Sequence, residues 1–215
     1  MIITEPDVAL TDYGLAVELA FFAYLLHNRG NRQQPLRTWF VLFFGSLGLA
    51  ALTGGSVHGF FSESDGEGHV ILWRATLLAM GMATLAAWAI GARIQFSETV
   101  ARWVLIAALA QFIGYCVNVL FVTQVFRIAI ADYLPAAVFL LFVFFLAYKR
   151  TRDRQPLVGS MGLTLTFVAS WVQQHGIALH PVYFDHNAFY HLIQAAALFM
   201  IFWAARGFVT EEVTQ

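Results

Sequence analysis

Apolar residues along the chain gather into seven long runs separated by short polar segments. The runs cover roughly residues 10–27, 38–61, 69–90, 102–124, 131–148, 156–174 and 186–205. A helix needs about twenty mostly apolar residues to cross a bilayer. A membrane β-barrel would instead give alternating segments of about ten residues. The pattern therefore predicts an all-α bundle of seven transmembrane helices, with the fourth break around Arg127 to Ala131.

Composition supports this fold class and excludes several others. Hydrophobic residues make up 60% of the 215 residues and charged residues only 12%, whereas a soluble domain carries about 25% charged residues. So few charges cannot cover a water-soluble globule, which excludes a soluble enzyme, a nucleic-acid-binding module and a disordered chain. The single cysteine, Cys116, excludes an intramolecular disulfide and a cysteine-rich metal cluster. Residues 1–215 are expected to form one domain.

The basic residues predict how the bundle is oriented. Ten of the twelve fall on one side of the predicted topology. These ten are Arg29, Arg32, Arg37, Arg93, Arg102, Lys149, Arg150, Arg152, Arg154 and Arg206. Because Lys and Arg stay on the cytoplasmic side, we expect the N-terminus outside and the C-terminus inside. The first twelve residues contain no basic residue, so the first span is expected to be retained in a bacterial inner-membrane protein.

Histidines are distributed unevenly across this topology. Six of the seven map to the outer side, and only His27 maps to the inner side. The six are His58, His69, His175, His180, His186 and His191. Imidazole is the commonest metal ligand, and ionisable groups at membrane depth suggest function. The alternative is that histidines near the water boundary are ordinary interfacial residues, which is easiest to accept for His69, His175 and His180.

Polar residues inside the predicted spans repeat at helical spacing. Asn187, His191 and Gln194 form one stripe, and Gln111, Tyr115 and Asn118 form another. Without water around them, such residues are expected to face the interior or a wet cavity. The alternative is interhelical hydrogen bonding that only holds the bundle together.

Two further features of the spans are open to more than one interpretation. Arg74 is a candidate for a buried ion pair with Glu18 or Asp132. Glycines also surround His58, at Gly54, Gly55 and Gly59. They indicate either close helix packing or room for a ligand.

These residues resemble the CREST superfamily of seven-span membrane proteins, which includes the alkaline ceramidases and the progestin/adiponectin receptors. The resemblance rests on the span count, on His58 late in span 2 and on His191 in the last span. Where the family has an H-x-x-x-H pair, this chain has Asn187 before His191, with His186 directly preceding it. The family serine falls at Gly54, and Ser56 is the nearest hydroxyl.

The resemblance implies a zinc-dependent hydrolase that cleaves an amide or ester bond of a membrane lipid. One zinc ion would be held near the outer face by His58, His191 and either His186 or His180, leaving one position for water. Asp65, Asp185, Glu18 or His69 would supply the general acid or base, and Ser56 or Tyr190 would stabilise the oxyanion. Asn187, Gln194 and Tyr190 would surround the metal. Asp185 is also a natural N-cap for the last helix.

Two functions from other classes fit the same residues. Paired histidines on neighbouring helices can ligate haem b, which would make the protein an electron carrier. Polar stripes could equally bind a solute in a non-enzymatic sensor or transporter. The haem alternative predicts a Soret absorption band, and the sensor or transporter alternative predicts no stoichiometric metal.

Overall fold

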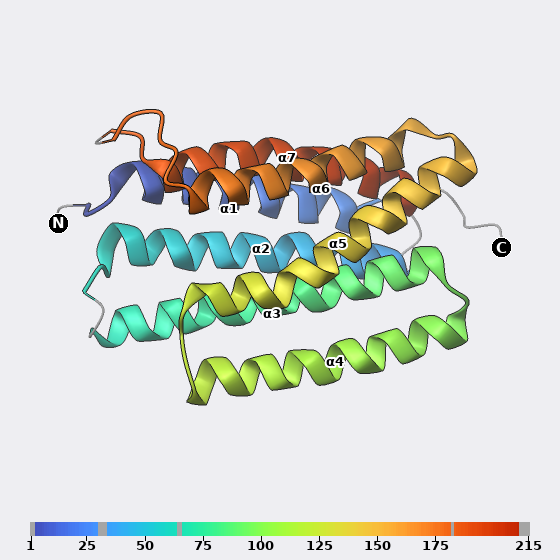
Figure 1. The fold of residues 1–215 in the computed structure, drawn as a ribbon, viewed down its shortest axis with the longest axis horizontal. Coiled ribbons are helices and arrows are strands. Elements are labelled where there is room, and N and C mark those ends of the chain that lie inside the picture. Colours follow the sequence, from blue (N-terminus) through green and yellow to red (C-terminus); the bar gives the residue numbers. More distant parts are fainter. Residues whose placement is uncertain (1–2, 30–33, 64–65, 182, 211–215) are drawn as a thin grey trace.

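The computed structural model describes residues 3–29, 34–63, 66–181 and 183–210, and within them the chain forms seven helices. They are α1 (Pro6–His27), α2 (Pro35–Phe60), α3 (Glu67–Gln95), α4 (Glu98–Phe121), α5 (Phe126–Thr151), α6 (Arg154–Gln174) and α7 (His186–Thr210). Successive helices run in opposite directions along one long axis (Figure 1). The all-α prediction is confirmed, and each apolar run coincides with a helix.

Six of the described helices, all except α6, are long and apolar enough to cross a membrane. The predicted position of the fourth break is wrong, because α5 already begins at Phe126. The chain turns between Phe121 and Phe126 instead, where the backbone N–H groups of Val122 and Thr123 both donate to the carbonyl of Asn118. The turn residues are Val122, Thr123, Gln124 and Val125, with no charged residue, Gly or Pro among them, so the sequence pattern marks the turn only weakly.

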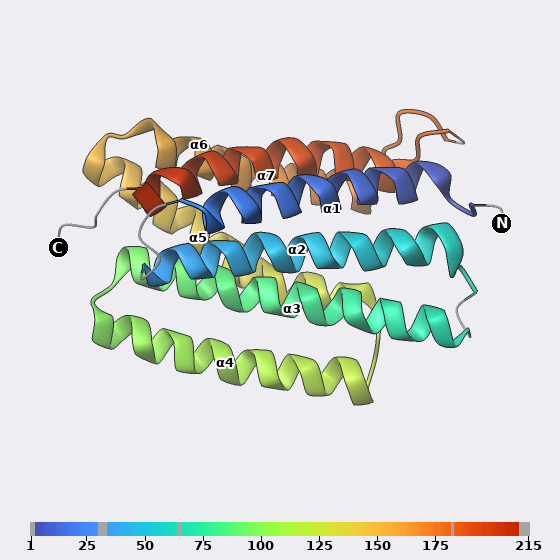
Figure 2. The same ribbon diagram turned by 180° about the vertical axis from the view of Figure 1, so that it is seen from behind.

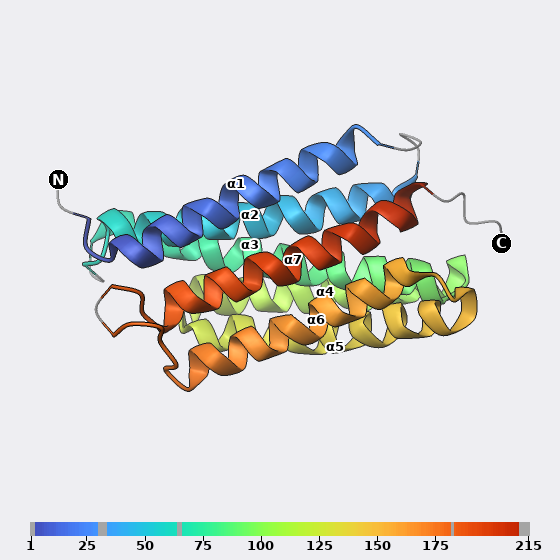
Figure 3. The same ribbon diagram turned by 90° about the horizontal axis from the view of Figure 1, so that it is seen from above.

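Six of the helices close into a ring, and α4 lies outside it. Each helix packs against the next in the order α1, α2, α3, α5, α6 and α7, and α7 packs back against α1. Figure 3 shows α7 between α1 and α6. The fourth helix packs on the outer side of α3, at the margin of the bundle (Figure 2). The interior of the ring is therefore the place where residues from six helices meet.

Helix starts follow the local sequence. Proline opens α1 and α2, where its missing N–H costs no hydrogen bond. The side chain of Asp153 accepts from the backbone N–H of Gln155 at the start of α6. The side chain of Asp185 accepts from the N–H groups of Asn187 and Ala188, which confirms that Asp185 caps α7.

The two ends of the ring differ in what fills them. Near the end where α1 finishes, large aromatic side chains pack in the interior, with the rings of Phe22 and Phe202 stacked at 4.2 Å between centroids. Phe40, Phe43, Phe44 and Phe144 are fully buried in the same cluster. We call this the aromatic cluster. It fills the ring interior at that end by close packing.

The opposite end, where α1, α3 and α7 begin, is called the histidine end. It carries His58, His69, His175, His180 and His186 at helix ends or in loops. The ten basic residues that the sequence assigned to one side include Arg32, which lies outside the described residues. The other nine lie at or near the end with the aromatic cluster. The two ends of the bundle thus differ in charge as the sequence predicted.

Candidate ligand-binding site

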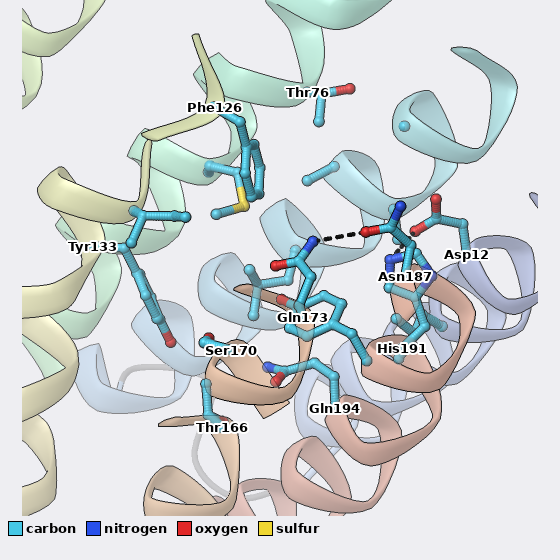
Figure 4. Close-up of a pocket in the computed structure, with 18 of the residues that line it drawn as sticks. Asp12, Thr76, Phe126, Tyr133, Thr166, Ser170, Gln173, Asn187, His191 and Gln194 are labelled. Carbon is cyan, nitrogen blue, oxygen red and sulfur yellow. Dashed lines mark hydrogen bonds and ion pairs between the residues drawn. The ribbon is translucent and has the colours of Figure 1, made fainter. Parts of the chain in front are cut away.

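A cavity of about 360 Å³ lies inside the ring towards the histidine end. Its lining comes from α1, α2, α3, α5, α6 and α7, and none of it comes from α4. One part of the wall is aliphatic or aromatic, including Leu15, Leu47, Phe126, Ile130 and Leu198. The polar part consists of Asp12, His58, Thr76, Tyr133, Thr166, Ser170, Gln173, Asn187, Tyr190, His191 and Gln194. Figure 4 shows most of these polar side chains.

The most buried charged contact of this wall joins α1 to α7. Nε2 of His191 lies 3.3 Å from Oδ1 of Asp12, and the two side chains are only 11% and 8% exposed. The other nitrogen of the same imidazole, Nδ1 of His191, lies 3.0 Å from Oγ1 of Thr11. Both nitrogens of His191 therefore already face protein partners.

This contact requires a proton on one of the two groups. A carboxylate oxygen and an unprotonated imidazole nitrogen are both acceptors, so they would repel each other at 3.3 Å. Ionised groups inside a bilayer are also costly unless they are paired. A neutral imidazole that carries its proton on Nε2 satisfies this contact, because it donates to Asp12 while its Nδ1 faces the hydroxyl of Thr11.

His58 and Trp73 line both this cavity and a second hollow of about 350 Å³ at the histidine end. Nδ1 of His58 lies 2.6 Å from Oε2 of Glu5, and the backbone N–H of Glu5 donates to the carbonyl of His58. The second hollow is also lined by His69, whose Nδ1 lies 2.7 Å from the carbonyl oxygen of Phe61. The segment before α1 is thereby held across the end of α2.

The structure brings together part of the predicted site. His58, Tyr190 and the whole stripe of Asn187, His191 and Gln194 line the same cavity. The stripe on α7 therefore faces the interior, as its spacing predicted.

Other predicted site residues do not line this cavity. His180 pairs through its backbone with Phe184, and its ring accepts from the N–H of Tyr183. His186 lies beside Asp185, with 3.9 Å between Nδ1 and Oδ2. Ser56 contacts Tyr13 between α1 and α2, with 3.1 Å between the hydroxyl oxygens. Asp185 serves as the N-cap of α7, and His69 is at the second hollow. Asp65 lies outside the described residues.

These positions do not form the zinc centre that the family resemblance implies. Among the described residues, no three His, Cys, Asp or Glu side chains are grouped so that they could hold one metal ion. Both ring nitrogens of His191 contact other side chains, and His186 and His180 do not line the cavity. The arrangement therefore does not fit three imidazole ligands around one zinc ion.

The second predicted stripe has a different role. Nε2 of Gln111 donates to Oδ1 of Asp132 at 2.8 Å, and the hydroxyl of Tyr115 donates to the carbonyl of Leu77. These bonds attach α4 to α5 and α3. The stripe therefore faces the neighbouring helices and forms interhelical hydrogen bonds, the alternative given above, and it does not line the cavity inside the ring.

The predicted partners of Arg74 are also wrong. Among the described residues, Arg74 forms no ion pair with Glu18 or Asp132. Its guanidinium instead faces the amide of Gln124, whose oxygen, once the amide is turned, accepts from Nε and Nη2 at 2.9 and 3.0 Å. Gln124 lies in the turn between α4 and α5, so Arg74 secures that turn to α3.

Sequence reasoning missed Asp12, Thr11, Gln173 and Ser170. A signal existed for Asp12, since it is an acid inside the first apolar run, just as Glu18 is. No local signal links Asp12 to His191, because 178 residues separate them and only the closing of the ring brings them together.

A family of unknown function, DUF6962, matches residues 8–210. The chain belongs to the DUF6962 family. No curated protein and no solved structure matches it. The matched region of DUF6962 runs from α1 to the end of α7, so it contains every residue that lines the main cavity.

Proposed function

We propose that this protein is a seven-span membrane protein that binds one amphiphilic, lipid-like molecule inside the helix ring. The observation that carries the proposal is the cavity itself, which combines a polar wall with an apolar wall at membrane depth. Small-molecule sites of about 300–1,000 Å³ share this design, with mostly apolar lining and a few polar groups that orient the ligand.

The membrane assignment rests on six long apolar helices and on the large hydrophobic side chains exposed outside the ring. Trp103, Ile113 and Phe121 of α4 are each more than half exposed, as expected for a surface in contact with lipid. We take α6 as the seventh span, because it packs against both α5 and α7 within the ring. The positive-inside rule then puts the histidine end outside.

The aromatic cluster favours binding over conduction. It fills the ring at the end opposite the cavity, so a solute in the cavity meets packed side chains rather than a path across the membrane. A transporter would have to move the aromatic side chains of this cluster apart in each transport cycle. A receptor, or an enzyme that works from one leaflet, would not.

Filling the cavity tests the proposal. Ala51 lines the cavity, and Ala51→Phe would place a ring where the ligand chain is expected. Purified protein in nanodiscs would be titrated with a fluorescent dodecyl-chain probe. We expect saturable binding at one site, reduced at least about tenfold by Ala51→Phe. The matched variant Ala110→Phe, on the exposed surface of α4, should bind normally. Absence of saturable binding in the unaltered protein would refute the proposal.

A second candidate function is hydrolysis of an amide or ester bond of the bound lipid. The Asp12–His191 contact favours it, since Asp12 orients the imidazole through Nε2 and Nδ1 is then the nitrogen that can accept a proton, beside the hydroxyl of Thr11. The test is release of dodecanoate from its ester or amide. Loss of turnover in His191→Ala, with probe binding retained, would support hydrolysis. No release above the buffer rate would exclude it for these substrates. The zinc ion implied by the family resemblance is not part of this proposal, because the described residues of the cavity do not fit three imidazole ligands around one metal ion.

A further inference from the structure

Gln194 carries an unused hydrogen-bonding group at the cavity. Its side chain is 8% exposed, lines the cavity and extends towards Ser170 and Thr166 (Figure 4). Its Oε1 is buried and has no hydrogen-bond partner among the described residues. Native structures rarely leave a buried amide unpaired, so this one indicates a partner from outside the chain.

Neighbouring groups offer both donors and acceptors. Gln173 donates through Nε2 to Oδ1 of Asn187 at 3.1 Å, which leaves the oxygen of Gln173 and the nitrogen of Asn187 for another partner. The hydroxyls of Ser170 and Tyr133 also line the cavity and form no hydrogen bond within the described part of the chain. An amide or hydroxyl presents donor and acceptor together, and would match this wall.

The charges of the wall exclude the two ionic alternatives. No Lys or Arg stands among the described residues that line the cavity, and its two histidines, His58 and His191, already face the carboxylates of Glu5 and Asp12, so an anionic head would find no free countercharge there. The one acid of the lining, Asp12, already faces His191. A cationic head would have to displace that imidazole.

We infer that the bound amphiphile has an uncharged head that both donates and accepts hydrogen bonds, a hydroxyl or an amide, and that Gln194 determines this specificity. The inference rests on the proposed function, because it names the head of a molecule that the cavity must first bind. The head lies against Gln194 and the Gln173–Asn187 pair, and the chain lies along the apolar wall.

A series of ligands with one chain length tests the inference by displacing the fluorescent probe from protein in nanodiscs. The series is dodecan-1-ol and its methyl ether, dodecanamide and its N,N-dimethyl derivative, dodecanoate, and dodecylammonium. We expect the alcohol or the primary amide to bind at least about tenfold more tightly than its methylated partner, because methylation removes the donor. Whichever of the two shows the larger ratio identifies the head. Both ions should bind at least about tenfold more weakly.

Gln194→Leu should reduce the ratio between each head and its methylated partner to less than about threefold, whereas Gln174→Leu, at an exposed position outside the cavity, should preserve it. If Gln194→Leu does not fold, Gln194→Met gives the same measurement with a side chain of similar length. Equal binding of the methylated ligands by the unaltered protein, or tighter binding of an ion, would overturn the inference while leaving the proposed function intact. No displacement by any member would count against the proposed function itself.

Discussion

Gly55 holds α1 and α2 close together, and substituting it tests how the Asp12–His191 pair is positioned. A Cβ atom added at Gly55 would lie 2.8 Å from Cβ of Asp12 and 3.3 Å from the backbone oxygen of Ala9. Neither atom is the end of a flexible side chain. Ordinary contact begins at 3.4 Å, so the helices would have to separate by about 0.6 Å, the difference between 3.4 and 2.8 Å.

Such overpacking typically costs about 1–3 kcal/mol of folding free energy. For a chain of 215 residues, each kcal/mol corresponds to about 2–4 °C in Tm. We therefore expect Gly55→Ala to melt about 2–12 °C below the unaltered protein, as followed by far-ultraviolet circular dichroism in detergent. Because Asp12 moves with α1, binding of the dodecyl-chain probe should weaken as well.

The same helix supplies two matched controls. At Gly54, an added Cβ would meet Oδ2 of Asp12 and Cγ2 of Thr76 at 3.7 Å, which is ordinary contact. At Gly45, it would meet nothing within 4 Å, and alanine should add up to about 1 kcal/mol of helix propensity. Gly54→Ala should melt within about 3 °C of the unaltered protein, and Gly45→Ala no lower than it. Equal melting temperatures for Gly55→Ala and Gly54→Ala would refute the close-packing argument.

Three further predictions concern topology, α4 and metal. A phosphatase reporter fused after Gln215 should be inactive and a fluorescent protein fused there should be bright, and the reverse pattern would invert the proposed orientation. Gln111→Leu should cost about 1–3 kcal/mol by removing the amide that donates to Asp132, yet preserve probe binding, and lost binding would contradict the placement of α4 outside the ring. Elemental analysis after purification without chelator should find less than about a tenth of an equivalent of transition metal, whereas a full equivalent that His58→Ala removes and His27→Ala keeps would restore the three-histidine zinc site.

The helices were predictable because a bilayer imposes one strict requirement on the sequence. Every backbone group at membrane depth must be satisfied internally, so long apolar runs read as helices. This requirement identifies the spans but not the exact residues of a turn. The break before Phe126 was placed too late because residues 122–125 contain no charged residue, Gly or Pro. Hydropathy is also a poor guide to α6. Its polar residues lower its hydropathy below that of the other six helices, and two of them, Ser170 and Gln173, line the cavity.

The site was predictable only where its members share one helix. The stripe containing His191 faces inward because polar side chains cannot be left in lipid, and helical spacing alone reveals it. The pairing of His191 with Asp12 depends on which helices become neighbours, and local periodicity carries no such information. The lack of tertiary information also explains why His180 and His186 were expected as zinc ligands. Both are near His191 in sequence, but the loop holds His180 and the start of α7 holds His186 away from the cavity.

The position of α4 outside the ring also decides the direction in which the ring helices run. Because the chain crosses once more in α4, α3 and α5 lie side by side in the same direction, as α7 and α1 do. The other four neighbouring pairs are hairpins, each closed by its own connection. The ring is thus two three-helix units that meet at two seams, α3–α5 and α1–α7, and neither seam is closed by a short loop. At the α1–α7 seam, the contact between Asp12 and His191 holds the two units together.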